Sequence, residues 1–362
     1  MPIIKLSSMG GTLTLFNELV DVLEKEGASD LHLSQDRVPV IRVSGFLIPL
    51  EKYPPLTESD IKGFLELFLI SENQREFALR KETNFAYSHK NGSRFRGNVF
   101  ETVGKVSVAL RLIPTKVKTF EELNLPPVLK DFAGRQQGFF LVVGPAGQGK
   151  STTLAAMVET INNDRLEHIV TIEDPIEFLF QPKKAIIDQR EVKTDTPDFH
   201  TALWGVFRQD ADVIMVGEMG EPDTIATAVP AAETGHLVLS TLHTNTAAQT
   251  VDRIIDSFPA DQQDQIRFQL SSSLIGIFSQ RLIPRVKGGL IPAYELLINN
   301  SAVANLIREK RTHEINAVIE TSSSEGMIDF NRSLSALVRA GEITPENAYQ
   351  YSNNPKGLER MI

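Results

Sequence analysis

Cysteine is absent from this chain of 362 residues. A disulfide framework, a thiol nucleophile and a cysteine-ligated zinc or iron–sulfur site are therefore excluded, and the composition is compatible with a reducing cytoplasm. Long apolar runs are missing as well, because stretches such as FFLVV at 139–143 are far shorter than the ~20 residues that cross a bilayer. The N-terminus, MPIIKLSSMGG, has no signal-peptide apolar region. These absences predict a cytoplasmic protein with no direct membrane insertion.

Basic clusters are scarce too. The 37 lysines and arginines are outnumbered by 46 aspartates and glutamates, which gives a formal net charge of -9, and no long basic block occurs. A general affinity for nucleic-acid backbones or anionic lipids therefore has no support in the composition. The length allows two or three domains at roughly 150 residues each.

The first third of the chain mixes helical and strand patterns. Apolar residues at helical spacing from Leu15 to Leu23 predict a helix, and Thr57 with Asp60 predicts a capping box at the start of another. Asn91-Gly92 is typical of a tight turn between strands. The expected strands are LHL at 31–33, VPVIRV at 38–43, FLI at 46–48, RFRGNVF at 94–100 and VSVALRL at 106–112.

From Gly138 onward the pattern changes to apolar strands separated by helical stretches, and beyond Pro259 helices are expected to dominate, including 301–310 and 329–340. We therefore predict an α/β protein with a small α+β domain over 1–113, a linker over 114–127 and an α/β domain with a helical C-terminal part over 128–362. The expected strands of the second domain are GFFLVV at 138–143, HIVTI at 168–172, DVIMV at 212–216 and HLVLSTL at 236–242.

A phosphate-binding loop is predicted at GPAGQGKST, 144–152, which matches the pattern GxxxxGK[ST] and lies between an apolar strand and a helix. Its glycines let backbone N–H groups surround a β-phosphate without Cβ clashes, Lys150 reaches the β- and γ-oxygens, and the Ser151 hydroxyl can ligate Mg²⁺. A chance match in this strand–loop–helix context is rare. The predicted nucleotide-binding residues are Gly144, Pro145, Ala146, Gly147, Gln148, Gly149, Lys150, Ser151 and Thr152.

Carboxylates follow two of the expected strands. Glu218 comes after DVIMVG, where a neighbouring strand would present a general base toward the γ-phosphate, although Gly217 stands where a metal-binding aspartate is usual. TIEDPIEF at 171–178 adds Glu173, Asp174 and Glu177. These three carboxylates are either part of the site or members of a solvated acidic turn, because most carboxylates in loops are simply exposed.

Two histidines, His236 and His243, flank one apolar strand. Their separation of seven residues puts them on opposite faces of a regular strand, which makes a shared metal site a poor interpretation. Either one could hydrogen-bond a γ-phosphate, or each could be a structural histidine.

Arginines alternate with apolar residues in two strands of the first domain. Arg94 and Arg96 flank Phe95, and Arg111 lies between Leu110 and Leu112, so the arginines belong to the polar faces. They are either ordinary surface residues or arginines that reach a nucleotide held by another domain or subunit.

The phosphate loop, TIEDPIEF, VIMVGEM and ETGHLVLSTLHT, in this order, resemble the secretion ATPase superfamily, and most closely the type IV pilus retraction (twitching motility) ATPases. The resemblance covers almost the whole chain. Further similar segments are SDLHLS at 29–34, FRGN at 95–98, QREV at 189–192, RQDADVIMVGE at 208–218, DRIIDSFP at 252–259 and ANLIREKRTHEI at 304–315.

The resemblance implies a PAS-like N-terminal domain and a RecA-like ATPase domain, assembled as a homohexamer with ATP and Mg²⁺ held between the two domains. Matching positions imply that Glu218 is the catalytic glutamate and that Ser151 binds the metal. They further imply catalytic roles for Glu173, Glu177, His236, His243, Arg96 and Arg111.

Two positions depart from the family pattern. Gly220, in GEMGE at 217–221, replaces a common arginine, and Ala304 replaces a frequent arginine in the segment at 304–315, which resembles a helix associated with retraction. Assembly and secretion relatives typically carry an extra N-terminal domain and often a tetracysteine metal site. A cysteine-free chain of this length is expected to have neither, which favours retraction.

The resulting hypothesis is a Mg²⁺-dependent ring ATPase that retracts type IV pili through an inner-membrane platform protein, at the cytoplasmic face of that membrane. An assembly or type II secretion motor of the same fold is the first alternative. A non-hydrolysing nucleotide-gated scaffold, suggested by Gly220, is the second. A nucleic-acid translocase is the third, and the net acidity argues against nucleic acid as a partner.

Overall fold

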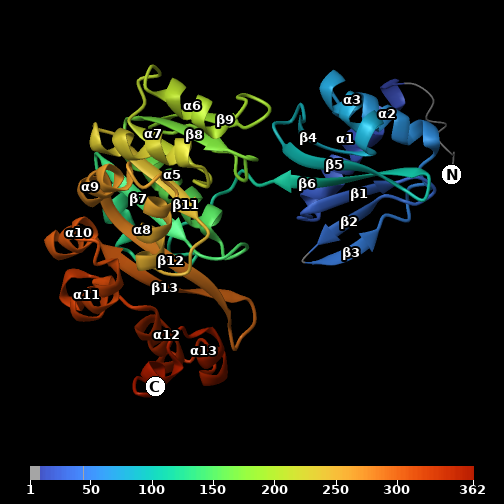
Figure 1. Cartoon of the computed structure of the whole chain (residues 1–362). Helices are drawn as coiled ribbons and strands as arrows, with labels where there is room; N and C mark the ends of the chain where they lie inside the picture. The colour runs from blue at the N-terminus through green and yellow to red at the C-terminus, as the bar shows by residue number, and fades with distance from the viewer. Residues whose placement is uncertain (1–8, 44) are drawn as a thin grey trace. The chain divides into compact units, whose positions relative to one another are not determined.

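The computed structural model describes residues 9–43 and 45–362, so most of the segment considered for a signal peptide lies outside the described residues. In the described ranges, no helix has both the length and the apolar character needed to cross a membrane. The chain divides into two compact units, Met1–Thr115 and Lys116–Ile362, and the division falls inside the linker expected at 114–127 (Figure 1).

The first unit contains an antiparallel six-stranded sheet in the order β3-β2-β1-β6-β5-β4, and its described residues, 9–43 and 45–115, also form three helices. Its elements are α1 (Met9–Lys25), β1 (Asp30–Ser34), β2 (Val40–Val43), β3 (Phe46–Pro49), α2 (Glu58–Phe68), α3 (Ser71–Arg80), β4 (Glu82–Ser88), β5 (Arg94–Thr102) and β6 (Lys105–Ile113).

Aromatic packing between α1, α2 and one face of the sheet forms the core of this unit. The ring of Phe16 on α1 is fully buried, with its centroid 4.8 Å from that of Phe68 on α2 and 5.8 Å from that of Phe95 on β5. Because side chains alternate along a strand, Arg94 and Arg96 lie on the face opposite to Phe95. The polar face predicted for these arginines is therefore present.

Two local signals in the first unit form as predicted. The Thr57 side chain accepts a hydrogen bond from the Asp60 N–H, and the Asp60 carboxylate accepts one from the Thr57 N–H, so α2 begins with a capping box. Gly92 has a φ of 92° in the turn between β4 and β5, a conformation that glycine adopts without strain.

The second unit is a seven-stranded sheet in the order β13-β12-β7-β11-β10-β8-β9, in which only β13 is antiparallel to its neighbour. Helices cover both faces, and the α/β fold predicted from the sequence is confirmed. Its strands and first helices are α4 (Leu129–Ala133), β7 (Gly138–Val143), α5 (Lys150–Asp164), β8 (His168–Glu173), β9 (Ile186–Glu191), α6 (Phe199–Val206), β10 (Val213–Val216), α7 (Pro222–Glu233), β11 (Leu237–Leu242), α8 (Ala247–Asp256), α9 (Gln263–Ser273), β12 (Leu274–Pro284) and β13 (Leu290–Ile298).

The strands β7, β10 and β11 are buried along their whole length, which explains their continuous apolar sequences. Alternate residues of β7 enter the two cores. Phe139 and Leu141 pack with the layer of α6 to α9, whereas Phe140 and Val142 pack with α4 and α5. The phosphate loop is therefore attached to the most deeply buried part of the sheet.

Helices dominate beyond Pro259, as predicted, but the region also contains two strands that the sequence did not predict, β12 with 11 residues and β13 with 9 residues. The sequence LIGIFSQRLIP mixes apolar residues with Ser279, Gln280 and Arg281, so it shows neither a clear alternation nor a continuous apolar run. In the structure these polar side chains have specific partners, and the strand is mostly buried.

Helices do form the end of the chain, where α12 and α13 pack beside β12 and β13 (Figure 1). The helix predicted at 329–340 corresponds to α12, and Gly341, with a φ of 69°, follows its end. The C-terminal elements are α10 (Ser301–Arg308), η1 (Thr312–Glu314), α11 (Ile315–Thr321), η2 (Ser323–Glu325), α12 (Phe330–Arg339), α13 (Pro345–Tyr351) and α14 (Pro355–Glu359).

Candidate active site

The phosphate loop connects the end of β7 to the first turn of α5, as predicted from its sequence. Gly144, Gly147 and Gly149 have φ values of 146°, 74° and 81°, which disfavour residues with a Cβ. A Cβ on Gly144 would also collide with the backbone oxygen of Gln280, whereas Gly147 has open space around its Cα. The backbone conformation therefore favours glycine at all three positions. At Gly144, close packing against the Gln280 backbone also requires it.

Lys150 lies at the start of α5 and turns its ammonium group back toward the loop. Its Nζ donates to the carbonyl oxygens of Gly144 and Pro145 at 2.9 and 3.0 Å. The same Nζ lies 3.3 Å from Nδ1 of His243. Burial lowers the pKa of Lys150, and the carboxylate of Glu218 opposes that shift.

His243 and Glu218 come to the loop because parallel strands end at the same edge of the sheet. β10 and β11 are hydrogen-bonded neighbours, and β11 also pairs with β7. The Nε2 of His243 lies 3.4 Å from Oε1 of Glu218. The structure therefore joins Lys150, His243 and Glu218 in one chain of contacts, although they are far apart in sequence. Ser151 and Thr152 follow Lys150 in the first turn of α5, and Ser151 is exposed.

The acidic turn after β8 contains residues of two kinds. Glu173 is buried and accepts hydrogen bonds from Thr171 Oγ1, Gln189 Nε2 and the Glu177 N–H at 2.7, 3.2 and 3.3 Å. Burial raises the pKa of Glu173, although these hydrogen bonds oppose the shift. Asp174 instead makes an ion pair of 3.1 Å with exposed Lys193, which is a surface arrangement.

His236 is not brought to the phosphate loop. It precedes β11, whereas His243 follows that strand, so the two rings lie at opposite ends of it. Its Nδ1 is 3.0 Å from the Ala231 carbonyl oxygen, and its ring meets that of Phe207 edge-on at 5.7 Å between centroids. The structure therefore does not place His236 beside the phosphate loop of its own chain.

Arg96 and Arg111 lie opposite each other on β5 and β6 of the first unit. The Nε of Arg111 donates to Oδ1 of Asp30 at 2.8 Å. Burial alone would raise the pKa of Asp30, but hydrogen bonds from Ser29 and Arg111 outweigh it, and the pKa falls below its ordinary value. Asp30 therefore stays ionised and fixes Arg111 on the polar face of the sheet.

Comparison with known proteins identifies the family. Residues 80–330 match the family described as Type II/IV secretion system protein. A type IV pilus retraction ATPase, PilT of Pseudomonas aeruginosa, is 42% identical over 341 residues, which cover 94% of this chain and 99% of that relative. The chain belongs to the PilT-like ATPases of the type II/IV secretion family. This confirms the resemblance found in the sequence.

Two further similarities extend over most of this PilT-like ATPase. A twitching motility protein of Neisseria gonorrhoeae is 42% identical over 321 residues, which cover 88% of this chain and 86% of the relative. A crystal structure of the pilus retraction motor PilT with bound ADP has a TM-score of 0.87 and 42% identity, covering 95% of this chain and 98% of the other.

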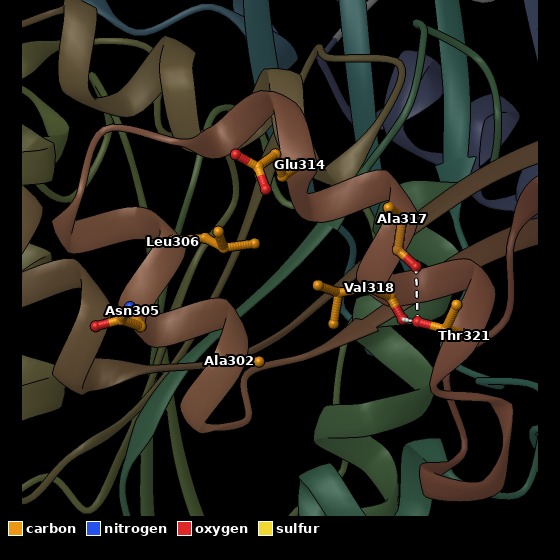
Figure 2. Close-up of a pocket in the computed structure, with 7 residues that line it drawn as sticks. All are labelled: Ala302, Asn305, Leu306, Glu314, Ala317, Val318 and Thr321. Atoms are coloured by element: carbon orange, nitrogen blue, oxygen red, sulfur yellow. Dashed lines mark hydrogen bonds between the residues drawn. The ribbon is translucent and has the colours of Figure 1, made fainter.

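The segment of the PilT-like ATPase that resembles a retraction-associated helix lies in α10 and η1. A pocket of about 360 Å³ opens between α10 and α11, and Leu306 and Val318 face it from the two helices (Figure 2). Ala304, the departure from the family pattern, is half-buried on α10 and does not line this pocket. The lining residues are Ala302, Asn305, Leu306, Glu314, Ala317, Val318 and Thr321.

Sequence reasoning missed several residues around the site. Gln280 on β12 contacts the phosphate loop, and Glu191 on β9 accepts a hydrogen bond of 3.3 Å from the Ile176 N–H in the acidic turn. Glu295 on β13 accepts one of 2.7 Å from the Ala247 N–H, just beyond the loop that carries His243. Each is a buried polar residue in a strand with no recognisable spacing, and the similar segment QREV at 189–192 contains Glu191 without indicating its role.

Proposed function

We propose that this chain is a Mg²⁺-dependent ATPase that powers the retraction of type IV pili. The contact chain of Lys150, His243 and Glu218 beside the phosphate loop is the observation that carries the proposal. The relatives named as a retraction ATPase and a twitching motility protein support the biological process. The ADP bound to the similar PilT structure supports nucleotide as the ligand.

The loop fits the phosphates of ATP by its shape and its charge. Gly147, where a Cβ would meet nothing within 4 Å, leaves room for an approaching phosphate, and Lys150 supplies a cation directed at the loop. The dipole of α5 adds a partial positive charge, because the loop lies at the helix N-terminus. Residues 144–152 are therefore the proposed nucleotide-binding residues.

Glu218 is the proposed general base. Its carboxylate lies beyond β10, next to His243, and can accept the proton of a water that attacks the γ-phosphorus in line. Lys150 would stabilise the negative charge on the transferring phosphoryl group. His243 would hold the carboxylate in place and report the γ-phosphate, because it contacts both Lys150 and Glu218.

The residues present also suit Mg²⁺. The Ser151 hydroxyl is exposed at the start of α5, and oxygen ligands of this kind are those that Mg²⁺ prefers. When bound, the ion would neutralise charge on the β- and γ-phosphates. Glu173 and Glu177 are proposed to support the site from the acidic turn, with Glu173 held rigidly by its three hydrogen bonds.

A homohexameric ring is the proposed assembly, in which Arg96 and Arg111 of the first unit reach a nucleotide bound by the second unit of a neighbouring subunit. Arginines that act in this way stabilise the transition-state charge. The proposed partner is an inner-membrane pilus platform protein, contacted at the cytoplasmic face of the membrane. The polar face formed by β5 and β6 supports the role of these arginines.

A motor for pilus assembly or type II secretion is the principal alternative, because it shares the fold and the chemistry. A non-hydrolysing scaffold is the second, since Gly220 lies beside Glu218 and leaves out the arginine that the family usually has there. Phosphate release from ATP by the purified chain would exclude the scaffold.

Counting surface pili on host cells that carry Lys150→Ala tests the direction of the motor. We expect an excess of pili that do not retract, because assembly continues while retraction stops. Bald cells would instead make the protein an assembly motor. An unchanged count, with normal retraction, would contradict a principal role in either process. The wild-type gene expressed at the same level is the control.

A further inference from the structure

We propose that Gln280 on β12 is a positioning residue that holds the phosphate loop in its binding shape. This inference deepens the proposed function and rests on it, because the loop is taken to bind the phosphates of ATP. Gln280 is 1% exposed, and its side chain is part of no phosphate-loop motif. It nevertheless contacts the loop at its beginning, at its end and in the helix that follows.

The register of the sheet explains why Gln280 reaches the loop. β12 is parallel to β7, and Ser279 pairs with Val143, the last residue of β7. Gln280 is the next residue of β12 and therefore lies beside Gly144, where the loop begins. A Cβ on Gly144 would overlap the Gln280 carbonyl oxygen, so the backbone of β12 limits the path of the loop from that side.

The side chain of Gln280 fixes the other end of the loop. Its Nε2 donates to the Gln148 carbonyl oxygen at 2.5 Å, and its Oε1 accepts from Thr153 Oγ1 at 2.7 Å. The Gln148 side chain also bonds to β12, because its Oε1 accepts a hydrogen bond from the Leu282 N–H at 2.7 Å. Two glutamines thus cross-link β12 to the last part of the loop and to α5.

These contacts have a direct consequence for phosphate binding. A loop that turns its N–H groups toward an anion must turn carbonyl oxygens away from it, and buried carbonyl oxygens need donors. Gln280 supplies a donor to the carbonyl oxygen of Gln148, immediately before Gly149 and Lys150. Loss of that donor leaves a part-buried acceptor without its protein partner and allows the peptide between Gln148 and Gly149 to rotate. Rotation there would misdirect the N–H groups that bind phosphate.

Steady-state ATP hydrolysis by the full chain tests this role, with KM and kcat measured together with thermal melting. Gln280→Leu removes both side-chain hydrogen bonds, and Gln280→Glu retains the acceptor for Thr153 but loses the donor to Gln148. We expect both variants to raise the KM for ATP by about tenfold or more, because both lose the part-buried hydrogen bond to the Gln148 carbonyl oxygen in the phosphate loop. Thr153→Val, which keeps that donor, should change KM less.

Arg281→Met is the matched control, because Arg281 is the next residue of the same strand and points to the C-terminal helices. Its guanidinium donates to the Tyr351 carbonyl oxygen and to Asn353 at 3.0 and 2.9 Å. This variant should lower the melting temperature and leave KM unchanged, since KM does not depend on the amount of folded enzyme.

Two results would overturn the positioning role. One is a wild-type KM in both Gln280 variants, and the other is a KM that rises equally in Arg281→Met, which would make the effect a general loss of stability. A wild-type chain that neither binds ADP nor hydrolyses ATP would contradict the proposed function itself, and with it this inference. Wild-type hydrolysis with unaltered variants contradicts the positioning role alone.

Discussion

Glu218 is the residue on which the proposed hydrolysis of ATP depends most directly, because it is the proposed general base. Its carboxylate is partly exposed and lies 3.4 Å from His243. Glu218→Gln keeps the shape of the side chain and one acceptor oxygen but removes the base. We expect kcat for ATP to fall by roughly 10²- to 10⁴-fold, the range typical of a lost general base, while ADP still binds within a few-fold of wild type.

Phosphate release and ADP titration calorimetry measure these two effects. Glu221→Gln is a matched control, because it makes the same change three residues further along the same loop, where the glutamate precedes α7 and caps it with no side-chain hydrogen bond. A Glu218→Gln variant with wild-type turnover would exclude Glu218 as the base. Loss of ADP binding would instead indicate a collapsed site.

Glu295 predicts how stability depends on pH. Burial raises its pKa to about 7 from an ordinary 4.5, in spite of the hydrogen bond that it accepts from Ala247. Between these two pH values the folded chain keeps a proton that the unfolded chain releases, so the free energy of unfolding falls as pH rises through this window. Glu295→Gln keeps an acceptor oxygen without the charge. As pH rises through this window, the free energy of unfolding of this variant should therefore fall less than that of wild type, and the difference should be on the order of 3 kcal/mol.

Urea denaturation at several pH values between 4.5 and 8 compares the two proteins. Glu320→Gln, a substitution of an exposed glutamate on α11, serves as the control and should follow wild type. Parallel curves for wild type and Glu295→Gln would contradict a raised pKa at this position.

At the scale of secondary structure, a glycine determines how β5 packs. Gly97 pairs with Phe85 on β4, and the ring of Phe85 covers the place where a Cβ on Gly97 would lie. Gly97→Ala should destabilise the chain by about 1–3 kcal/mol, because an additional methyl group overfills a buried site. Phe85→Leu in the same chain should recover part of this loss, because the smaller side chain leaves room for the methyl group.

A double-mutant cycle in urea measures the coupling between the two positions. The double variant should lose less stability than the sum of the two single variants, by at least ~0.5 kcal/mol. Additive losses would mean that the methyl group on residue 97 does not meet the ring. Gly205→Ala on α6, where a Cβ has only ordinary contacts, is the control for adding a methyl group.

The elements that the sequence predicts are those with a strong local pattern. β7, β10 and β11 are continuous apolar runs, the phosphate loop has its own motif, and the capping box marks the start of α2. β12 was missed because its polar residues belong to contacts with distant segments. The side chain of Gln280 hydrogen-bonds to the phosphate loop, and that of Arg281 hydrogen-bonds to Tyr351 near the end of the chain. The roles of these two residues are therefore visible only in the folded structure.

The same difference applies to the candidate site. Lys150 and Glu218 were predicted from motifs, and the parallel strands then explain why they meet. The buried carboxyl of Glu295 and the donor on Gln280 were not predicted, because an isolated Glu or Gln in a strand has no local signature. His236 is the opposite case: it belongs to a sequence motif, but the fold does not bring it to the phosphate loop.

At the scale of the whole molecule, the proposed ring can be tested by mixing two inactive chains. Lys150→Ala disables the phosphate loop but retains Arg96, whereas Arg96→Ala retains the loop. If the arginine acts on a neighbouring subunit, a Lys150→Ala subunit supplies the arginine that an adjacent Arg96→Ala subunit needs. Random mixing in equal amounts should then complete about a quarter of the sites, because a ring repeats one head-to-tail interface.

Phosphate release per mole of chain measures this recovery, after the two variants are produced together. Each variant alone should be slow, because an arginine of this kind accounts for roughly 10³- to 10⁵-fold in rate. A mixture of Lys150→Ala with Glu218→Gln is the control, since both changes affect the same unit and no complete site can form. Equal rates in the two mixtures would contradict an arginine supplied by a neighbour. Recovery confined to the first mixture would place the first unit of one subunit at the nucleotide of the next, and the loss of that nucleotide would then alter how adjacent subunits are held together.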